Sequence, residues 1–365
     1  MNILPKFLYL FQSVPVFIPK SYFDTLDSII SSYIWKGKRP RVSRTHLQKS
    51  KPNGGLALPN FRLYYWAANI RSLLYWANGR QTSSTSWLTM EVSSSQHIPL
   101  AALLGASYPL SVPHPITSPV IQQSLRVWTQ FRKCLRLCSF SLQTPILSGC
   151  LFPPSSLDLA FKDWQVMGIK SFKDLFIDNN FASFDQLTNK FGIPRTHFFR
   201  YLQIRHFLQS QLPDFPEAPQ SSVIDDILSL QPSGKGLISK IYSKLTDLNQ
   251  VSTARIRAAW EQDLNQHLSD DAWDSILGLV NATSFCSRHS LLQFKVVHRA
   301  HMSKAKLSHI YPDVNPQCDK CGSDEATLIH SFWVCPRLRT YWQEVFQTLS
   351  VDLSILSIYL KIQTS

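Results

Sequence analysis

Apolar side chains recur at helical spacing along most of this chain, and strict alternation of apolar and polar positions is rare. Phe23, Leu26, Ile30 and Tyr33 share one helix face, which predicts a helix over residues 21–35 that ends at Gly37. Similar patterns predict helices from about residue 60, over 121–138, and over 237–248, 252–265 and 270–282. We therefore expect a mainly α protein built from several small helical modules.

One short stretch departs from the helical pattern. Residues 41–49 alternate weakly and are followed by the strong turn signal Pro52-Asn53-Gly54-Gly55, so a short β-hairpin is expected near 41–58. The next helix has Asn60 as its N-cap. We expect its aromatic side chains mostly in the core, with one or two available to stack on bases; they are Tyr64, Tyr65, Trp66, Tyr75 and Trp76.

Shifts in composition divide the chain into five segments. Residues 1–80 are a basic, aromatic helical segment, and 81–120 are a connector rich in Ser, Thr and Pro. Residues 121–212 form an aromatic-rich helical module, 213–235 a linker, and 236–365 a helical C-terminal module with a Cys/His cluster. A chain of 365 residues is long enough for two or three domains.

The charge balance points to a polyanionic partner. The net charge is +13, which favours RNA or DNA over other partners. No run approaches the roughly 18–20 apolar residues of a membrane span, and the N-terminus lacks the features of a signal peptide. We therefore expect an intracellular protein of the nucleus or cytoplasm that does not contact membranes. Cys134, Cys138, Cys150 and Cys286 show no ligand-like spacing and are expected to be buried free thiols.

The first basic segment lies at residues 36–51. No acidic residue occurs between Asp27 and Glu91, whereas a solvated surface normally mixes both signs. This pattern predicts contacts with nucleic-acid phosphates, and an ordinary basic surface is the alternative. The candidate contacts in this segment are Lys36, Lys38, Arg39, Arg41, Arg44, Lys49 and Lys51.

The second basic segment lies at residues 288–306, within an acid-free stretch from Ser275 to Pro312. If one helix runs through it, Arg288, Lys295, Arg299 and Lys306 fall within about 40° of one line. Together with Lys304 they would form a basic ridge for a phosphate backbone, although an ordinary solvated face is also open.

A short stretch near the C-terminus combines residue type and spacing in a way that predicts a specific chemistry. Cys318, Cys321, His330 and Cys335 follow the spacing C-x2-C-x8-H-x4-C. Three thiolates and one imidazole are the ligands of a closed, tetrahedral structural Zn²⁺ site. Because His330 and Cys335 are five residues apart, at least one of them should lie at a helix end or in a loop. Chance proximity of these residues is the alternative.

These motifs carry a resemblance that covers nearly the whole chain. Tyr33-Ile-Trp-Lys-Gly-Lys-Arg-Pro-Arg41 and Gly54-Gly-Leu-Ala-Leu-Pro-Asn60 resemble the segment just downstream of the reverse-transcriptase domain in LINE-type (non-LTR) retrotransposon polyproteins. His298-Arg-Ala-His-Met-Ser, the Cys-x2-Cys-Gly turn and Thr327-Leu-Ile-His-Ser-Phe-Trp-Val-Cys335 are similar to the C-terminal Cys/His segment of the same polyproteins.

The resemblance implies a non-catalytic region that binds RNA or DNA and supports target-primed reverse transcription in an intact element. It also implies a polymerase domain packed against the N-terminal segment, and we expect the chain to be a truncated gene product. The aromatic-x-Asp-Asp hairpin that a polymerase needs for two-metal chemistry is absent. The pairs Asp225-Asp226 and Asp270-Asp271 are expected at helix starts instead.

Two other classes of function stay open at this point. The chain could be a zinc-stabilised helical module that binds acidic proteins through its basic patches. It could also be a nuclease or polymerase that uses the aspartate pairs, which the missing motifs disfavour. Our expectation is a protein that is not an enzyme.

Overall fold

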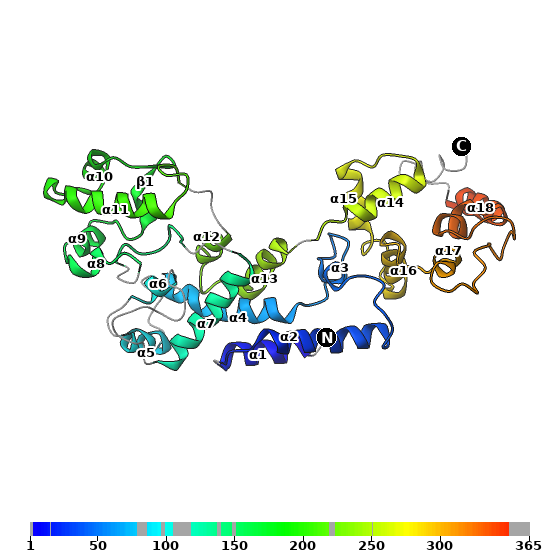
Figure 1. Ribbon diagram of the computed structural model, residues 1–365, viewed down its shortest axis with the longest axis horizontal. Coiled ribbons are helices and arrows are strands. Elements are labelled where there is room, and N and C mark those ends of the chain that lie inside the picture. Colours follow the sequence, from blue (N-terminus) through cyan, green and yellow to red (C-terminus); the bar gives the residue numbers. More distant parts are fainter. Residues whose placement is uncertain are drawn as a thin grey trace. The chain divides into compact units, whose positions relative to one another are not determined.

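The computed structural model describes residues 3–14, 16–78, 86–95, 99–104, 118–136, 140–147, 151–218, 223–249 and 251–349. These residues are mainly helical, which confirms the expected fold class (Figure 1). Within them, no helix is both long enough and apolar enough to cross a membrane. Cys138, Cys150 and much of the connector expected at 81–120 lie outside the described residues.

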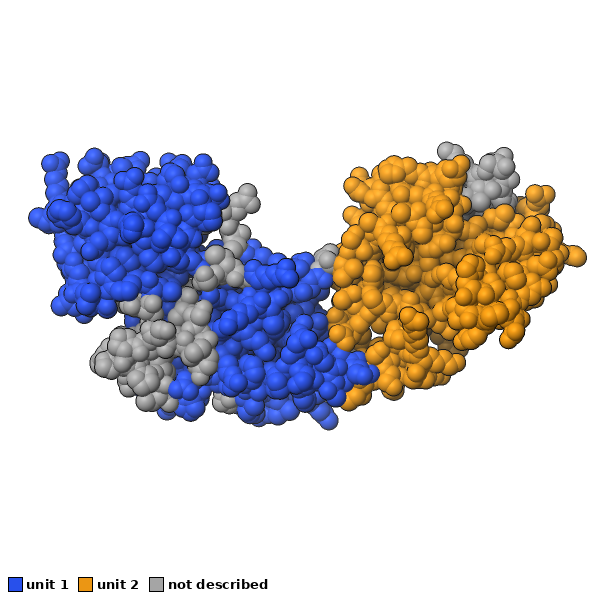
Figure 2. Space-filling model, in the orientation of Figure 1, with its two compact units in different colours: residues 1–28, 59–249 blue, residues 29–58, 250–365 orange. Residues whose placement is uncertain are grey.

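The chain forms two compact units, coloured separately in Figure 2. The first contains residues 1–28 and 59–249, and the second contains residues 29–58 and 250–365. Each unit therefore joins segments that are distant in sequence, and the five modules expected from composition stay a prediction. Helix α2 (Lys20–Trp35) begins in the first unit and ends in the second.

The other helices of the first unit, in chain order, are α1 (Ile3–Ser13), α4 (Phe61–Asn78), α5 (Ser86–Ser94), α6 (Leu100–Leu103), α7 (Pro119–Cys134), α8 (Pro154–Leu157), α9 (Phe161–Val166), η1 (Phe172–Leu175), α10 (Phe184–Phe191), η2 (Arg195–His197), α11 (Phe198–Gln211), α12 (Val223–Leu228) and α13 (Leu237–Leu248). Helices α5 and α6 lie in the expected connector, and Leu88, Leu100 and Leu103 on them are buried.

Helix α4 is the centre of the first unit and packs against α1, α6, α7 and α13. Its start is capped as expected, because the Leu63 amide donates to Asn60 Oδ1 at 3.1 Å. Tyr242 of α13 stacks on Tyr64 with ring centroids 3.8 Å apart, and its hydroxyl accepts the Asn60 amide. The expected core role of the aromatic residues is confirmed for those that are fully buried, namely Tyr65, Trp66 and Trp76.

The described residues between 140 and 215 form an aromatic module within the first unit. Phe152, Phe161, Trp164 and Phe172 are almost completely buried at its centre. Its two strands, β1 (Phe176–Ile177) and β2 (Asn180–Phe181), pair antiparallel through Phe176 and Phe181. The linking residues Asp178 and Asn179 both have positive φ, as the tight hairpin turn requires.

The hairpin expected near 41–58 is not formed there. Instead, α3 (Arg44–Gln48) occupies most of the stretch that was expected to be a strand. Ser43 caps this helix through its hydroxyl, and the amides of Leu56 and Leu58 both donate to the Leu47 carbonyl. The Ser43 cap and the hydrogen bonds from Leu56 and Leu58 favour the helix more than the weak alternation of residues 41–49 favours a strand.

The second unit also contains α14 (Ala254–Leu264), α15 (Asp270–Leu279), α16 (Ser287–Val297), α17 (Lys304–Ser308), η3 (His330–Val334), η4 (Pro336–Leu338) and α18 (Arg339–Leu349). One of its cores joins Val42 and Leu47 to Val280 and Phe294. Asn281 donates to the Gly55 carbonyl at 2.9 Å, and His298 Nε2 donates to the Gly54 carbonyl at 2.7 Å. Residues 41–58 are thereby fixed to the C-terminal helices.

Candidate metal centre and basic segments

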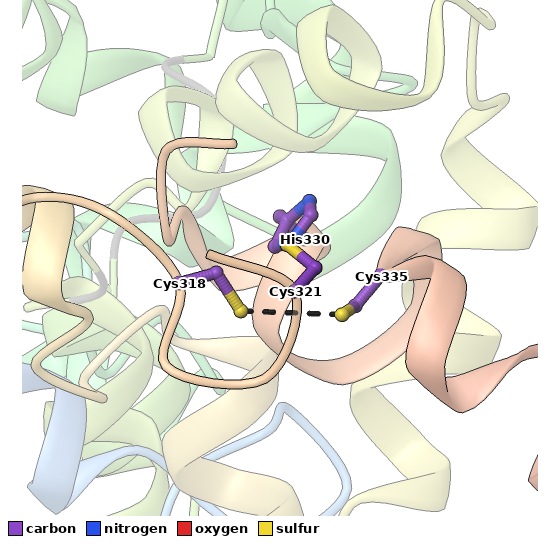
Figure 3. Close-up of side chains that lie close together, drawn as sticks. All are labelled: Cys318, Cys321, His330 and Cys335. Carbon is purple, nitrogen blue, oxygen red and sulfur yellow. Dashed lines mark hydrogen bonds between the residues drawn. The ribbon is translucent and has the colours of Figure 1, made fainter. Parts of the chain in front are cut away.

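Cys318 and Cys321 lie on a tight turn that the local sequence explains. The Cys318 amide donates to the Asp324 carbonyl at 2.8 Å, and the Gly322 amide donates back to the Cys318 carbonyl at 2.7 Å. Gly322 has φ of 72°, a conformation that glycine adopts without strain. The turn therefore directs both cysteine side chains to the same side of the loop, as Figure 3 shows.

His330 and Cys335 belong to an unusual helical turn. Five residues along a regular helix would place them about 140° apart. Here η3 is a π-helix, and the Cys335 amide donates to the His330 carbonyl at 3.1 Å, closing one turn over five residues. Both side chains consequently reach the same point. His330 begins this helix and Cys335 follows its last residue, so the expectation of a helix end is confirmed.

The four side chains converge in Figure 3, with their ligand atoms all within 4.8 Å of one another. Cys318 Sγ lies 3.9 Å from Cys335 Sγ, and Cys321 Sγ lies 3.3 Å from His330 Nε2. A tetrahedral ion with bonds of about 2.3 Å to sulfur and 2.0 Å to nitrogen would hold its ligands about 3.5–3.8 Å apart. The group could therefore hold a metal ion with little rearrangement.

The surroundings of Cys321 and Cys335 shift the pKa values of these two thiols in opposite directions. Amide groups of Asp324 and Ser323, with smaller contributions from the Ser323 side chain and His330, lower the pKa of Cys321 to about 6. Burial instead raises the pKa of Cys335. Asp324 Oδ2 lies 3.8 Å from His330 Nδ1, on the ring nitrogen that does not face Cys321. At this distance the carboxylate lies beside the ring without a hydrogen bond to it. We refer to residues 316–338 as the metal segment.

The first basic segment is mostly exposed, with one exception. Lys36, Lys38, Arg39, Arg41, Arg44 and Lys51 have exposed side chains. Lys49 is only 8% exposed, and burial lowers its pKa. Lys49 is therefore less available to a nucleic acid than its basic neighbours, and the contact expected of it stays a prediction.

The second basic segment does not form the expected ridge. Helix α16 ends at Val297, Arg299 has φ of 51°, and a new helix begins only at Lys304. The Ala300 amide donates to the Lys295 carbonyl, which closes the helix end, and Ser303 caps the next helix. The prediction of one continuous helix is therefore wrong, because the chain bends between α16 and α17.

Several side chains of the second basic segment already have partners. Arg299 pairs with Asp263 at 2.6 Å and lies over the Trp260 ring. Lys304 pairs with Asp319, and Lys306 donates to the Arg299 carbonyl at 2.8 Å. Arg288 is exposed and Lys295 is half-buried. Of the expected ridge, Arg288 and Lys295 are the more available cations.

The structure brings the two basic segments together, because Val42 and Leu47 share a core with Phe294 and Ala300. Burial lowers the pKa of His301 most, and the nearby charges of Lys295, Arg41 and Lys306 lower it further. Arg41 comes from the first segment and the two lysines from the second. No local pattern in the sequence predicts this packing, because it depends on contacts such as His298 with Gly54, 244 residues apart.

The remaining candidates have the following places. Asp225 and Asp226 lie in the first turn of α12, and Asp270 and Asp271 in the first turn of α15, which confirms their expected positions. Cys134 and Cys286 are exposed, so the expectation that they are buried is wrong. Cys134 is the last residue of α7, and Cys286 precedes the first turn of α16.

A search of known protein-family models finds none that matches this sequence.

Proposed function

We propose that this protein is a non-catalytic nucleic-acid-binding region of a LINE-type retrotransposon reverse transcriptase that supports target-primed reverse transcription. The observation that carries the proposal is the packing of the first basic segment on the second, where Val42 and Leu47 share a core with Phe294 and Ala300 and the rings of His46 and His298 lie 5.7 Å apart. Two acid-free basic segments and the Cys/His cluster thereby belong to one compact unit. Such a concentration of one sign of charge is suited to a polyanion.

The exposed cations of the first segment would supply most of the affinity. Lys36, Lys38 and Arg39 follow directly on α2, where the positive φ of Lys36 and Gly37 ends the helix. Residues 29–58 contain no acidic side chain to neutralise them. Phosphate contacts of this type bind RNA and DNA without regard to sequence and weaken steeply with salt.

We further propose that the metal is Zn²⁺ and that its role is structural. Three thiolates and one imidazole complete a tetrahedral shell and leave no position for a substrate or water. The bound ion would fix the turn at 318–322 to η3, and so hold the segment that follows the second basic segment. Zinc binding and nucleic-acid binding would then depend on each other.

The N-terminal helices suit the partner implied by the resemblance. Ile3, Tyr9 and Leu10 on α1 are between 51% and 70% exposed, and Tyr22 on α2 is 45% exposed. Large apolar side chains on a surface commonly mark a protein-contact site. In an intact element, this surface would pack against the polymerase domain.

The proposal is tested by the salt dependence of RNA and DNA binding. In the triple variant Lys36→Ala, Lys38→Ala, Arg39→Ala, each lost phosphate contact should reduce the salt slope by about 0.7–0.9. Binding would be measured by fluorescence anisotropy between roughly 50 and 200 mM salt.

A matched variant controls for the change in net charge. Lys162→Ala, Lys173→Ala, Arg195→Ala removes the same charge from exposed positions of the aromatic module, and its salt slope should equal that of the unmodified protein. If neither RNA nor DNA binds at low salt, or if the two triple variants behave alike, the proposal is wrong. Binding to an acidic protein instead would favour the zinc-stabilised interaction module.

A further inference from the structure

A cavity of about 300 Å³ lies beside the metal centre, within the second unit. Cys318 forms part of its wall, so the cavity adjoins the metal ligands directly. A volume of this size is at the lower end of the range for sites that bind small molecules. It is large enough for one planar heterocycle.

The walls of the cavity are suited to a flat ring. Phe332 and His301 line it with ring centroids 5.5 Å apart and planes inclined at 54°. Ala326 and Leu328, which are 4% exposed, add an apolar surface. An aromatic face beside small apolar side chains favours stacking of a planar ligand over binding of a compact ion.

The polar groups of the cavity indicate what kind of planar ligand would bind. Lys304 and Lys320 line the cavity and bring ammonium groups, held by Asp319, which is also part of the wall, and by the Ser331 carbonyl respectively. Ammonium groups beside an aromatic face suit a base and the phosphate attached to it.

We propose that this cavity binds one unpaired nucleobase, stacked on Phe332 with its phosphate near Lys320 and Lys304. The inference rests on the proposed nucleic-acid-binding function and adds a preference for single strands. Bases within a duplex are paired and stacked, and their faces cannot reach an aromatic side chain. A single strand, in contrast, presents every base face.

The test compares a 12-nucleotide single-stranded RNA with a duplex of the same sequence, using the full chain. Phe332→Leu keeps an apolar side chain but removes the ring. It should weaken binding of the single strand about 5- to 150-fold, the value of one base stacked on an aromatic ring. Duplex binding should not change, and Phe332→Tyr should restore the single-strand affinity.

Two further variants keep the experiment decisive. Phe285→Leu removes an aromatic side chain that is fully exposed and does not line the cavity, and it should leave both affinities unchanged. Ser331→Leu fills the cavity without removing Phe332, so it provides the same test if Phe332→Leu fails to fold. Each variant would first be checked for unchanged helix content and metal content.

The outcomes separate this inference from the proposed function. Salt-dependent binding with equal affinity for single strand and duplex would overturn the cavity proposal and leave the proposed function intact. An unchanged single-strand affinity in both Phe332→Leu and Ser331→Leu would also overturn it. Loss of all nucleic-acid binding in the unmodified protein would overturn both.

Discussion

The aromatic module of the first unit and the metal segment of the second are stabilised by different means. The module buries a large apolar cluster in which Phe161, Trp164, Phe172 and Leu187 are 0% exposed. The buried cluster of the metal segment consists of Cys318, Ala326 and Cys335. Two of these three side chains are candidate ligands.

The difference is a physical reason to expect that one region folds by burial and the other with a bound ion. Apolar burial stabilises a fold by about 25 cal/mol per Å² of apolar surface removed from water, and the buried cluster of the metal segment is much smaller than that of the aromatic module. A segment as small as this usually depends on a metal or a disulfide. Metal binding should then be coupled to folding in the metal segment and be irrelevant to the aromatic module.

Removing the metal should produce the largest difference between the two regions. Structural Zn²⁺ contributes an apparent free energy of about 10–16 kcal/mol in zinc-finger peptides. Chelation, or the substitution Cys321→Ser, should therefore unfold the metal segment while the aromatic module keeps its structure. Hydrogen exchange followed by mass spectrometry would report both regions in one experiment, alongside the metal content.

An exposed cysteine of the same unit provides the control. Cys286→Ser should leave the metal content and the exchange pattern unchanged, because Cys286 does not belong to the cluster. Equal protection of the metal segment with and without metal would contradict the coupling of metal binding to folding.

Weakening the apolar core should have the opposite effect, destabilising the aromatic module and leaving the metal segment unchanged. Phe172 is completely buried and contacts the rings of Phe140, Phe152 and Phe207. Phe172→Ala should lower the free energy of unfolding of the aromatic module by about 3–5 kcal/mol, because it leaves a cavity. The metal content of the protein should not change. Urea denaturation monitored by tryptophan fluorescence would measure the effect.

The control is the same chemical change on the surface of the module. Phe199 is 77% exposed, and Phe199→Ala should change the stability by no more than about 0.5 kcal/mol. A loss of metal in Phe172→Ala would show that the two regions are not independent in stability.

The two regions also differ in how far their sequences revealed them. The ligands of the metal segment could be predicted, because soft donors at C-x2-C spacing and a glycine at the turn are local signals. Helix α2 and the cap at Asn60 were predictable for the same reason. The π-helix was not, although the spacing of His330 and Cys335 excluded a regular helix.

The failures occurred where distant contacts decide the local structure. Residues 288–306 have the composition of one helix, but α16 ends before His298, whose ring donates to the Gly54 carbonyl. Lys49 looked like its basic neighbours, yet it is only 8% exposed. The contact of His298 comes from a residue 244 positions away. Lys49 is buried where the chain turns back on itself and the Ala57 amide donates to the Lys49 carbonyl. The residue pattern of one segment cannot predict its contacts with other segments.

The smallest expected effect concerns a buried histidine of the aromatic module. Trp164 Nε1 donates to His197 Nδ1 at 3.0 Å, which requires the neutral ring with its proton on Nε2. Burial lowers the pKa of His197, and so does Arg200, whereas Asp163 and Asp158 act in the opposite direction. Since the folded state favours the neutral ring, stability should fall as the pH drops below the unfolded pKa of about 6.5.

Two substitutions at this position separate the hydrogen bond from the titration. His197→Gln keeps an acceptor for Trp164 at every pH, so it should remove the loss of stability between pH 7.5 and 5.5. His197→Leu leaves the buried Trp164 N–H without a partner and should cost about 1–3 kcal/mol at both pH values. Urea midpoints of the module at the two pH values would measure this. Acid also protonates thiolate ligands, so the metal segment must be followed separately. If the aromatic module of His197→Gln still loses stability in acid, His197 is not its titrating group.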